Sequence, residues 1–598
     1  MVAVAQLVES WIVIPVVVGS SPISHPTKIC TKDSTATSVA VFFSIAASVC
    51  KLTAYGNLMA LVTPFKNKSV LILDDMPEAR ASMRAQLGSL GCERIAVTAT
   101  VKDALEQFKN DRFDVVLADY YLGGGTDGQQ FLEYLRTRRI IGRGVLFVMV
   151  TAEKGYENVV TAAECLPDDY LLKPFTADVL KLRLERLLEK KLRLATIDKL
   201  QDKGDWAGVV KVCDEIIEAR DRYLVDAMRI KGNALLASGR ADEAVEFYRQ
   251  MIALRPLPWA KLGLSRALHQ LGKVDECKES LGGLIQESPH LMAAYDLLGK
   301  VHLASGDPDA ALGILDSACI IAPNSLARHR AVAAVAEDKG DFKRVEAALE
   351  KVVKKTRNTP LRETEDIARL GNAFTENGEP VKAVALIEEA CKNFKSDFDD
   401  AHLAAVEALA HQKAGNRDKA EAALSRAMRS DTAHLPPAAA MAVAKACLTT
   451  GKRDEAHGIL KTLVQTHPEA KVLHDRVSTV LRNHGSGTGA ENLVAESIRE
   501  IIQLNNEAVL KAKAGELALA AEMLTKAAQR LPGNMQIVAN AASALLFDVL
   551  NNGLNAEKMI QAQAFQKAVQ SRDPAYPKLA EIEDLLGRIR ARFTAGRK

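Results

Sequence analysis

The sequence is poor in the residues that mark several protein classes. Aromatic residues make up 5% of the 598 residues, and the nine cysteines stand without a Cys-x-x-Cys pair. Isolated cysteines give no sign of a zinc site and favour a reducing cytosol. The net charge is only +3, and acidic and basic residues are interleaved, which argues against a nucleic-acid-binding surface. The apolar run over Val39–Cys50 is too short to cross a membrane.

The chain is too long for one hydrophobic core and is expected to fold as several domains. Its hydrophobic fraction of 48% and charged fraction of 26% are typical of a globular protein in water. Alanine is abundant and aromatic residues are few, which favours closely packed helices.

Four short apolar runs between residues 69 and 175 end at polar residues. Their length and β-branched content predict strands buried on both faces. Helical patterns separate them, which favours a parallel, doubly wound sheet. Such sheets bind ligands at the carboxyl ends of their strands. The polar residues at these ends are Asp74–Asp75, Asp119, Thr151 and Lys173.

The chemistry of these side chains suits a phosphoryl group. Three carboxylates in one crevice repel one another unless a cation lies among them, and oxygen ligands suit Mg²⁺. The metal ion and Lys173 would neutralise an incoming phosphoryl group, and the Thr151 hydroxyl would donate a hydrogen bond to it. An aspartate can itself be the nucleophile and form an aspartyl phosphate.

This part of the chain resembles a response-regulator receiver domain. The similar stretches are Leu71–Arg80, Phe113–Asp119, Thr126–Gly128 with Phe131 and Leu132, Val150–Glu153 and Tyr170–Phe175. The resemblance implies a flavodoxin-like α/β fold with five parallel strands.

The same resemblance implies a role for each site residue. Asp119 is the expected phosphoacceptor. The expected Mg²⁺ ligands are Asp75, Asp74 through water, Asp119 and the backbone carbonyl of Tyr121. Lys173 is expected to contact the phosphoryl group, and Thr151 with Tyr170 to relay the conformational change.

Two alternatives remain at this point. These residues could be ordinary polar side chains at strand ends, or the domain could resemble a receiver without ever being phosphorylated. The loop Asp119–Gly125 also departs from the usual Met-Pro-Gly pattern. A tyrosine beside the acceptor is expected to slow the entry or loss of the phosphoryl group.

A glycine recurs after the receiver with a period near 34 residues, which is the signature of a helix–turn–helix solenoid. The glycines are Gly204, Gly239, Gly272, Gly306, Gly340, Gly378, Gly415, Gly451 and Gly515. Alanines follow many of them after five and twelve residues, and prolines after seventeen. Glycine permits the tight turn between two helices, alanine allows close packing, and proline ends the second helix.

The pattern, as in Ala237–Tyr248, resembles tetratricopeptide repeats, whose concave surface binds proteins or peptides. The receiver resemblance implies a receiver domain over residues 68–190, followed by an expected linker helix over 191–200, and the glycine period predicts a repeat array over 201–475. An irregular insert is expected over 476–506, with a flexible Gly-rich loop, and a further repeat with capping helices over 507–598. One amphipathic helix is expected over Thr176–Leu200, with Leu180, Leu184, Leu187, Leu188 and Leu192 on one face.

The first 58 residues have a separate interpretation. Codons that fit Val2–Glu9, Trp11–Pro15 and Gly19–His25 can spell the arms of a histidine tRNA gene. We therefore expect residues 1–58 to be non-native, with a true start at Met59, or disordered. Residues 59–67 are then a short leader.

The sequence thus predicts a cytoplasmic, bacterial response regulator whose phosphorylation on Asp119 controls protein binding by its repeats. The expected phosphodonor is a histidine kinase or phosphotransfer protein. No basic helix-turn-helix unit indicates a transcription regulator, and no motif after residue 200 indicates an enzyme. A scaffold protein whose unphosphorylated receiver is a docking module is the main alternative.

Overall fold

The computed structural model describes residues 65–122, 127–152, 167–357, 359, 361–393, 397–429, 435–485, 487–573 and 576–594. The expectations for residues 1–58 and for Gly123–Thr126 and Glu153 lie outside this part of the chain. Within the described residues, no helix is long and apolar enough to cross a membrane.

The receiver is built on a sheet of five parallel strands, as the sequence predicts. The strands are β1 (Ser69–Leu73), β2 (Arg94–Thr98), β3 (Val115–Asp119), β4 (Leu146–Thr151) and β5 (Asp169–Leu172). Their order in the sheet is β2-β1-β3-β4-β5, the doubly wound order of flavodoxin-like folds. The chain places β2 on one side of β1 and then crosses to place β3 on the other side. Strands β1 and β3 are therefore neighbours, and their carboxyl ends meet.

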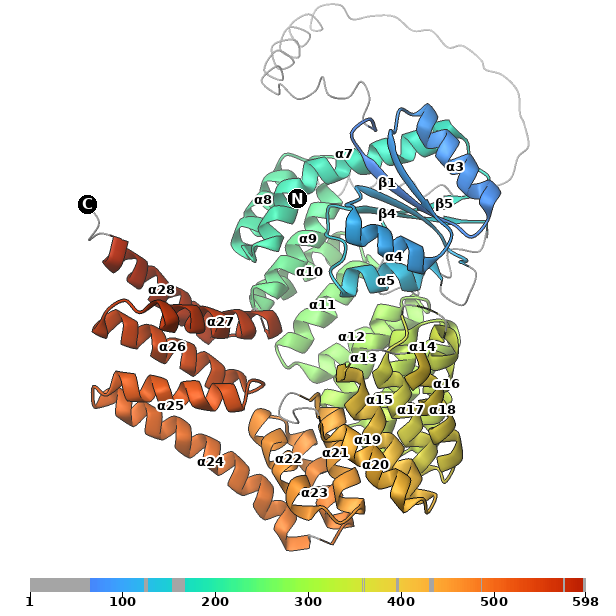
Figure 1. The fold of residues 1–598 in the computed structure, drawn as a ribbon. Coiled ribbons are helices and arrows are strands. Elements are labelled where there is room, and N and C mark those ends of the chain that lie inside the picture. The colour runs from blue at the N-terminus through green and yellow to red at the C-terminus, as the bar shows by residue number, and fades with distance from the viewer. Residues whose placement is uncertain are drawn as a thin grey trace, which may run out of the picture. The chain divides into compact units, whose positions relative to one another are not determined.

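Helices cover both faces of this sheet (Figure 1). Helices α3 (Pro77–Ser89) and α7 (Ala177–Asp202) pack on one face, and α4 (Val101–Asn110) and α5 (Gly128–Thr137) pack on the other. Strands β1, β3 and β4 are buried throughout, which explains their unbroken apolar runs.

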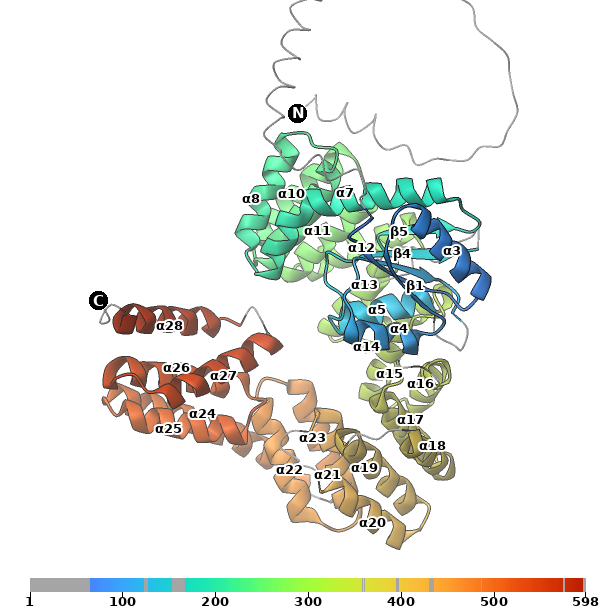
Figure 2. The ribbon, with the colours of Figure 1, turned by 45° about the horizontal axis from the view of Figure 1, so that its top comes forward.

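Helix α7 is one uninterrupted element that runs past the receiver into the first repeat (Figure 2). The Thr176 side chain accepts a hydrogen bond from the Val179 amide and caps its start. The leucine face was only partly predicted. Leu180, Leu184 and Leu187 are buried, but Leu192 is 76% exposed. At 100° per residue Leu192 lies about 120° from Leu180, so the buried face continues through Leu194 and Ile197 instead.

The chain divides into two compact units at Arg328. The first unit holds the receiver, α7 and the helices α8 (Trp206–Glu218), α9 (Leu224–Ala237), α10 (Ala241–Leu254), α11 (Pro258–Gln270), α12 (Val274–Glu287), α13 (Met292–Ala304) and α14 (Pro308–Ile321). Helix α15 (Leu326–Lys339) begins in the first unit and continues in the second.

The second unit is all helical. It contains α16 (Phe342–Thr356), α17 (Thr364–Glu376), α18 (Pro380–Asn393), α19 (Asp397–Lys413), α20 (Arg417–Ala427), α21 (Pro437–Thr449), α22 (Arg453–Thr466), α23 (Lys471–Asn483), α24 (Gly487–Lys513), α25 (Leu517–Arg530), α26 (Met535–Asn552), α27 (Ala556–Arg572) and α28 (Lys578–Thr594). The last two are the helices expected near the carboxyl end, and α28 closes the core formed with α25 and α26.

The recurring glycines form the turns between antiparallel helices. All nine have positive φ angles, between 71° and 87°, a conformation that L-residues with a Cβ adopt at a cost. The alanines five residues later, such as Ala244, Ala311 and Ala420, are fully buried. The predicted roles, glycine in the turns and alanine in the close packing of helices, are therefore confirmed.

The irregular insert predicted over residues 476–506 is wrong, because α23 and α24 occupy it. Gly485, at φ 84°, continues the repeat period. No proline stands seventeen residues later, where Ile502 lies inside α24. The second helix of one unit therefore runs directly into the first helix of the next as a single element of 27 residues. Burial of Ile501 and Ala508 outweighs the low helix propensity of the glycines at its start.

Candidate functional site

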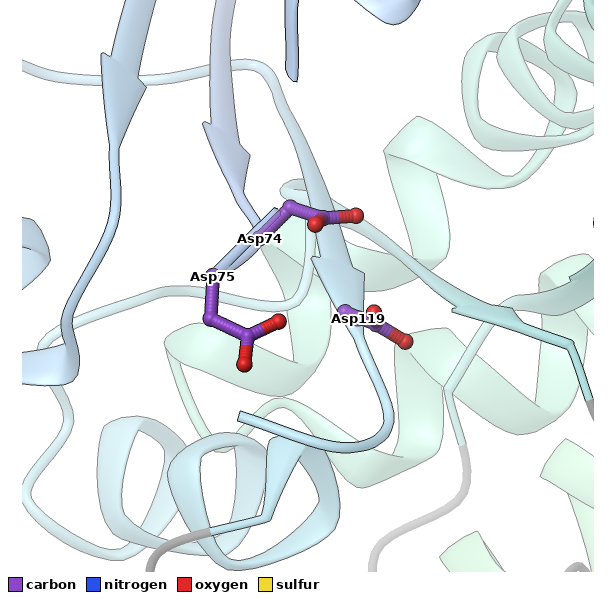
Figure 3. Close-up of side chains that lie close together, drawn as sticks. All are labelled: Asp74, Asp75 and Asp119. Carbon is purple, nitrogen blue, oxygen red and sulfur yellow. The ribbon is translucent and has the colours of Figure 1, made fainter. Parts of the chain in front are cut away.

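Three carboxylates meet at the carboxyl edge of the sheet (Figure 3). Asp74 and Asp75 follow β1, and Asp119 is the last residue of the adjacent strand β3. One carboxylate oxygen from each lies within 4.8 Å of the others. Asp74 is fully buried and Asp119 nearly so, whereas Asp75 is exposed. A cation can therefore approach this group from solvent on the Asp75 side.

Lys173, just after β5, offsets part of the negative charge of the two buried carboxylates. Its Nζ lies 2.6 Å from Oδ2 of Asp74 and 2.7 Å from Oδ2 of Asp119. Lys173 is held at this edge through its backbone, whose N–H donates to the carbonyl of Thr151 at 2.7 Å. The lysine thus joins β1, β3 and β5 across β4.

The pKa shifts at this site follow from burial and from the lysine. Burial raises the pKa of Asp119 above its ordinary value, although Lys173 and the Tyr121 N–H favour the charged carboxylate. For Lys173, burial disfavours the ammonium, but hydrogen bonds and charges from Asp119 and Asp74 outweigh it and raise its pKa. The lysine therefore stays charged at neutral pH.

The other predicted residues lie around this centre. Thr151 ends β4 and is 2% exposed. Tyr170 on β5 is half-buried with a buried hydroxyl oxygen, and burial raises its pKa. Tyr121 is 55% exposed and forms an isolated bridge with Asp127. The metal-ligand role of the Tyr121 carbonyl and the relay role of Thr151 and Tyr170 stay predictions.

Two contributors were not singled out from the sequence. Nη1 of Arg80 on α3 donates to the Asp74 carbonyl at 2.6 Å. Asp127 and Gln130 form a reciprocal capping box at the start of α5, for which Asp-x-x-Gln was an available sequence signal. The Arg80 contact depends on how α3 packs and has no such local signal.

The close packing of α5 against β3 defines one wall of the site. A Cβ atom on Gly128 would lie 2.3 Å from the carbonyl oxygen of Asp119. Only glycine fits at this position, so α5 starts directly against the backbone of the central aspartate. The arrangement offers a carboxylate nucleophile, a neutralising ammonium and oxygen ligands for a hard cation.

Comparison with known proteins identifies the same two parts of the chain. The family model for the response regulator receiver domain matches residues 70–185. Two tetratricopeptide repeat models match residues 214–257 and 405–471, and residues 258–281 and 292–317.

The similar proteins align with the receiver part of the chain. "Chemotaxis protein CheY-3" of Vibrio cholerae is 30% identical over 125 residues, which are 21% of this chain and 95% of that protein. "Chemotaxis protein CheY" of Pseudomonas aeruginosa is 31% identical over 121 residues, 20% of this chain and 96% of the relative. The solved structure of the chemotaxis response regulator CheY4 of Vibrio cholerae is 25% identical, with a TM-score of 0.19, and covers 20% of this chain and 98% of its own. The chain belongs to the response regulator receiver family, with tetratricopeptide repeats following the receiver.

Proposed function

We propose that Asp119 accepts a phosphoryl group and that its phosphorylation state regulates protein binding by the repeats. The observation that carries this proposal is the pairing of Lys173 with both Asp74 and Asp119 beside the exposed carboxylate of Asp75. We infer that the protein is a cytoplasmic, bacterial signalling protein. The phosphodonor would be a histidine kinase or a phosphotransfer protein.

The donor set fits Mg²⁺. All candidate ligands are oxygen atoms, and the exposed Asp75 leaves room for water, which Mg²⁺ retains in most protein sites. Asp74, Asp75, Asp119 and the Tyr121 carbonyl would hold the ion. When bound, it would supply positive charge that neutralises phosphoryl oxygens.

The chain's own residues would carry the transfer. A carboxylate oxygen of Asp119 attacks the phosphorus atom, and the bond from phosphorus to the donor's nitrogen or oxygen breaks. The leaving group keeps the bonding electrons and takes up a proton. Lys173 exchanges its bond to Asp119 for one to a phosphoryl oxygen, so the ammonium remains paired. Thr151 and Tyr170 then adjust to the new group.

Acetyl phosphate with Mg²⁺ tests the proposal on the full-length chain. Intact-mass analysis should show one added phosphoryl group, and chelation of the metal should prevent it. Asp119→Asn should abolish the addition. Asp178→Asn, which removes an exposed carboxylate in the first turn of α7, is the matched control and should remain competent. Equal labelling of the Asp119→Asn variant would refute Asp119 as the acceptor.

Absence of labelling in the wild type, with acetyl phosphate and with a range of histidine kinases, would favour a docking module in a scaffold protein. In that function the repeats would bind their partner with the same affinity whatever phosphodonor is present.

A further inference from the structure

A second connection, separate from α7, joins the receiver to the repeats within the first unit. Nε2 of Gln130 donates a hydrogen bond of 3.2 Å to the carbonyl oxygen of Asn324. Gln130 lies in the first turn of α5, and Asn324 lies in the turn between α14 and α15. Gln130 is 5% exposed and Gln129 is 9% exposed. The start of α5 is thus a covered surface.

The same glutamine side chain is tied to the chain segment that follows Asp119. Its Oε1 accepts a hydrogen bond from the Asp127 N–H at 3.2 Å, and the backbone N–H of Gln130 donates to Asp127 Oδ1 at 2.7 Å. One residue further, the Gly128 N–H donates to the Tyr120 carbonyl at 2.8 Å. The Gln130 side-chain amide therefore links Asp127 with a turn of the repeats, and the neighbouring Gly128 N–H continues the connection to Tyr120, next to the expected phosphoacceptor.

The contacts between Asp119, the start of α5 and Asn324 leave little room for independent movement. The backbone of Asp119 packs against Gly128 so closely that a Cβ would lie 2.3 Å from its carbonyl oxygen. A shift of the Asp119 backbone must therefore move the start of α5. The bond to Asn324 is already 3.2 Å long, and a lengthening of about 0.5 Å takes it beyond hydrogen-bonding range.

We infer that the first turn of α5 docks on the α14–α15 turn in the unphosphorylated chain, and that phosphorylation of Asp119 releases it. This inference rests on the proposed function, since it requires a phosphoryl group at Asp119. The phosphoryl group carries about −1.5 to −2 charges, which replace the single negative charge of the Asp119 carboxylate. It needs both space and backbone donors beside Asp119, where the Tyr121 N–H already serves the carboxylate. Tyr120 and Tyr121 must shift to provide them, and the Gly128 N–H that donates to the Tyr120 carbonyl must shift with them.

Hydrogen–deuterium exchange on the full-length protein tests the release. The peptide that covers Ala322–Leu326 should exchange about threefold faster after treatment with acetyl phosphate and Mg²⁺, because exchange follows the local opening equilibrium. Intact mass, measured on the same sample, reports phosphorylation independently. Failure of the proposed function would show as no added mass. Added mass with unchanged or slower exchange at Ala322–Leu326 would overturn this inference alone.

The Gln130→Glu variant separates docking from helix capping. A glutamate at this position can still accept from the Asp127 N–H and suits a helix start, but it lacks the N–H that binds Asn324 and repels that carbonyl. The Ala322–Leu326 peptide should exchange fast without phosphate and respond no further to it. Gln107→Glu, which adds the same charge on α4, should behave as wild type. A phosphate response retained in full by Gln130→Glu would show that the contact has no regulatory part.

Discussion

At the scale of single residues, Lys173 supplies the positive charge that pairs with the buried carboxylates of the site. Its ammonium faces one fully buried carboxylate, Asp74, and one nearly buried carboxylate, Asp119. Neither is exposed enough for water to replace the lysine. Removing one partner of a buried ion pair leaves the other charge uncompensated, and that loss exceeds the value of the pair itself.

Lys173→Ala is therefore predicted to lower the free energy of unfolding by about 3 kcal/mol at neutral pH without Mg²⁺. Added Mg²⁺ should restore more stability to this variant than to the wild type, because the ion supplies the missing positive charge. Thermal unfolding with and without the metal measures both effects. Lys109→Ala, which removes an exposed surface pair with Glu106, should change stability by less than about 1 kcal/mol. An equal Mg²⁺ response in wild type and Lys173→Ala would contradict the charge argument.

The titration of Asp119 gives a second prediction at this scale. Its pKa in the folded chain lies above the ordinary value of 3.8, chiefly because of burial. A raised pKa means that the protonated form contributes stability below pH 3.8, and that this contribution is lost as pH rises through the folded pKa. Carboxyl ¹³C NMR, assigned with Asp119→Asn, should show a midpoint above 3.8. Mg²⁺ should lower the midpoint and Lys173→Ala should raise it; shifts of opposite sign would contradict the proposed charge balance.

At the scale of elements, glycines serve two unlike purposes in the repeats. Gly272 has a φ of 71° with open space around it, so it is needed for its backbone. Gly263 and Gly232 face Tyr248, where a Cβ would lie 2.2 Å from a ring carbon and 2.4 Å from the hydroxyl oxygen, respectively. Tyr248 on α10 is 1% exposed, so these glycines are needed for the space that they leave.

Gly272→Ala is predicted to destabilise the chain by about 1 kcal/mol, because the alanine must adopt a left-handed conformation. Gly283→Ala is the matched control. It adds the same methyl group within α12, where nothing lies within 4 Å, and should stabilise by about 0.5–1 kcal/mol. Urea unfolding followed by helical circular dichroism compares the two. The backbone argument fails if both substitutions shift the midpoint in the same direction.

Gly263→Ala is predicted to destabilise by about 1–3 kcal/mol, since the added methyl group overlaps a buried ring that cannot move without disturbing α9, α10 and α11. Fluorescence of the neighbouring Trp259, whose ring lies 6.4 Å from that of Tyr248, should change in the same variant. Unaltered stability and fluorescence would show that the ring has more freedom than its burial indicates.

At the scale of the whole molecule, the continuous helix α7 connects the receiver with the first helices of the repeats. The helix starts three residues after Pro174 and continues without a break to Asp202. Lys191, beyond the last receiver turn, pairs with Asp168 at 3.0 Å and donates to the Arg143 carbonyl. These contacts hold the extension of α7 against the receiver.

Phosphorylation of Asp119 is predicted to change the affinity of the repeats for their protein partner. A tenfold change corresponds to about 1.4 kcal/mol of coupling, which is small against the stability of a domain. The partner is first captured with the full-length chain and isolated. Its affinity for the phosphorylated and for the unphosphorylated full-length protein is then measured by titration. Thr151→Ala should remain phosphorylated but show weaker coupling. Identical affinities with and without phosphate, over a range of salt, would contradict the prediction.

The sequence by itself determined the receiver and the repeat period, because both depend on short-range patterns. Apolar runs that end in Asp74, Asp119 and Thr151 specify buried parallel strands, and the order of those strands brings their ends together. Glycines near every thirty-fourth position specify turns, since few other residues accept the positive φ angle. Local chemistry was sufficient at these positions.

Tertiary structure decided what depends on packing between distant segments. The continuous helix α24 was missed because the glycines at its start have low helix propensity, although the folded chain buries Ile501 and Ala508 within the same helix. Helix geometry alone places Leu192 away from Leu180, but packing against α8 and α9 decided that Leu194 and Ile197 continue the buried face. The bond between Gln130 and Asn324 joins residues 194 positions apart, and only the folded chain brings such groups within hydrogen-bonding distance.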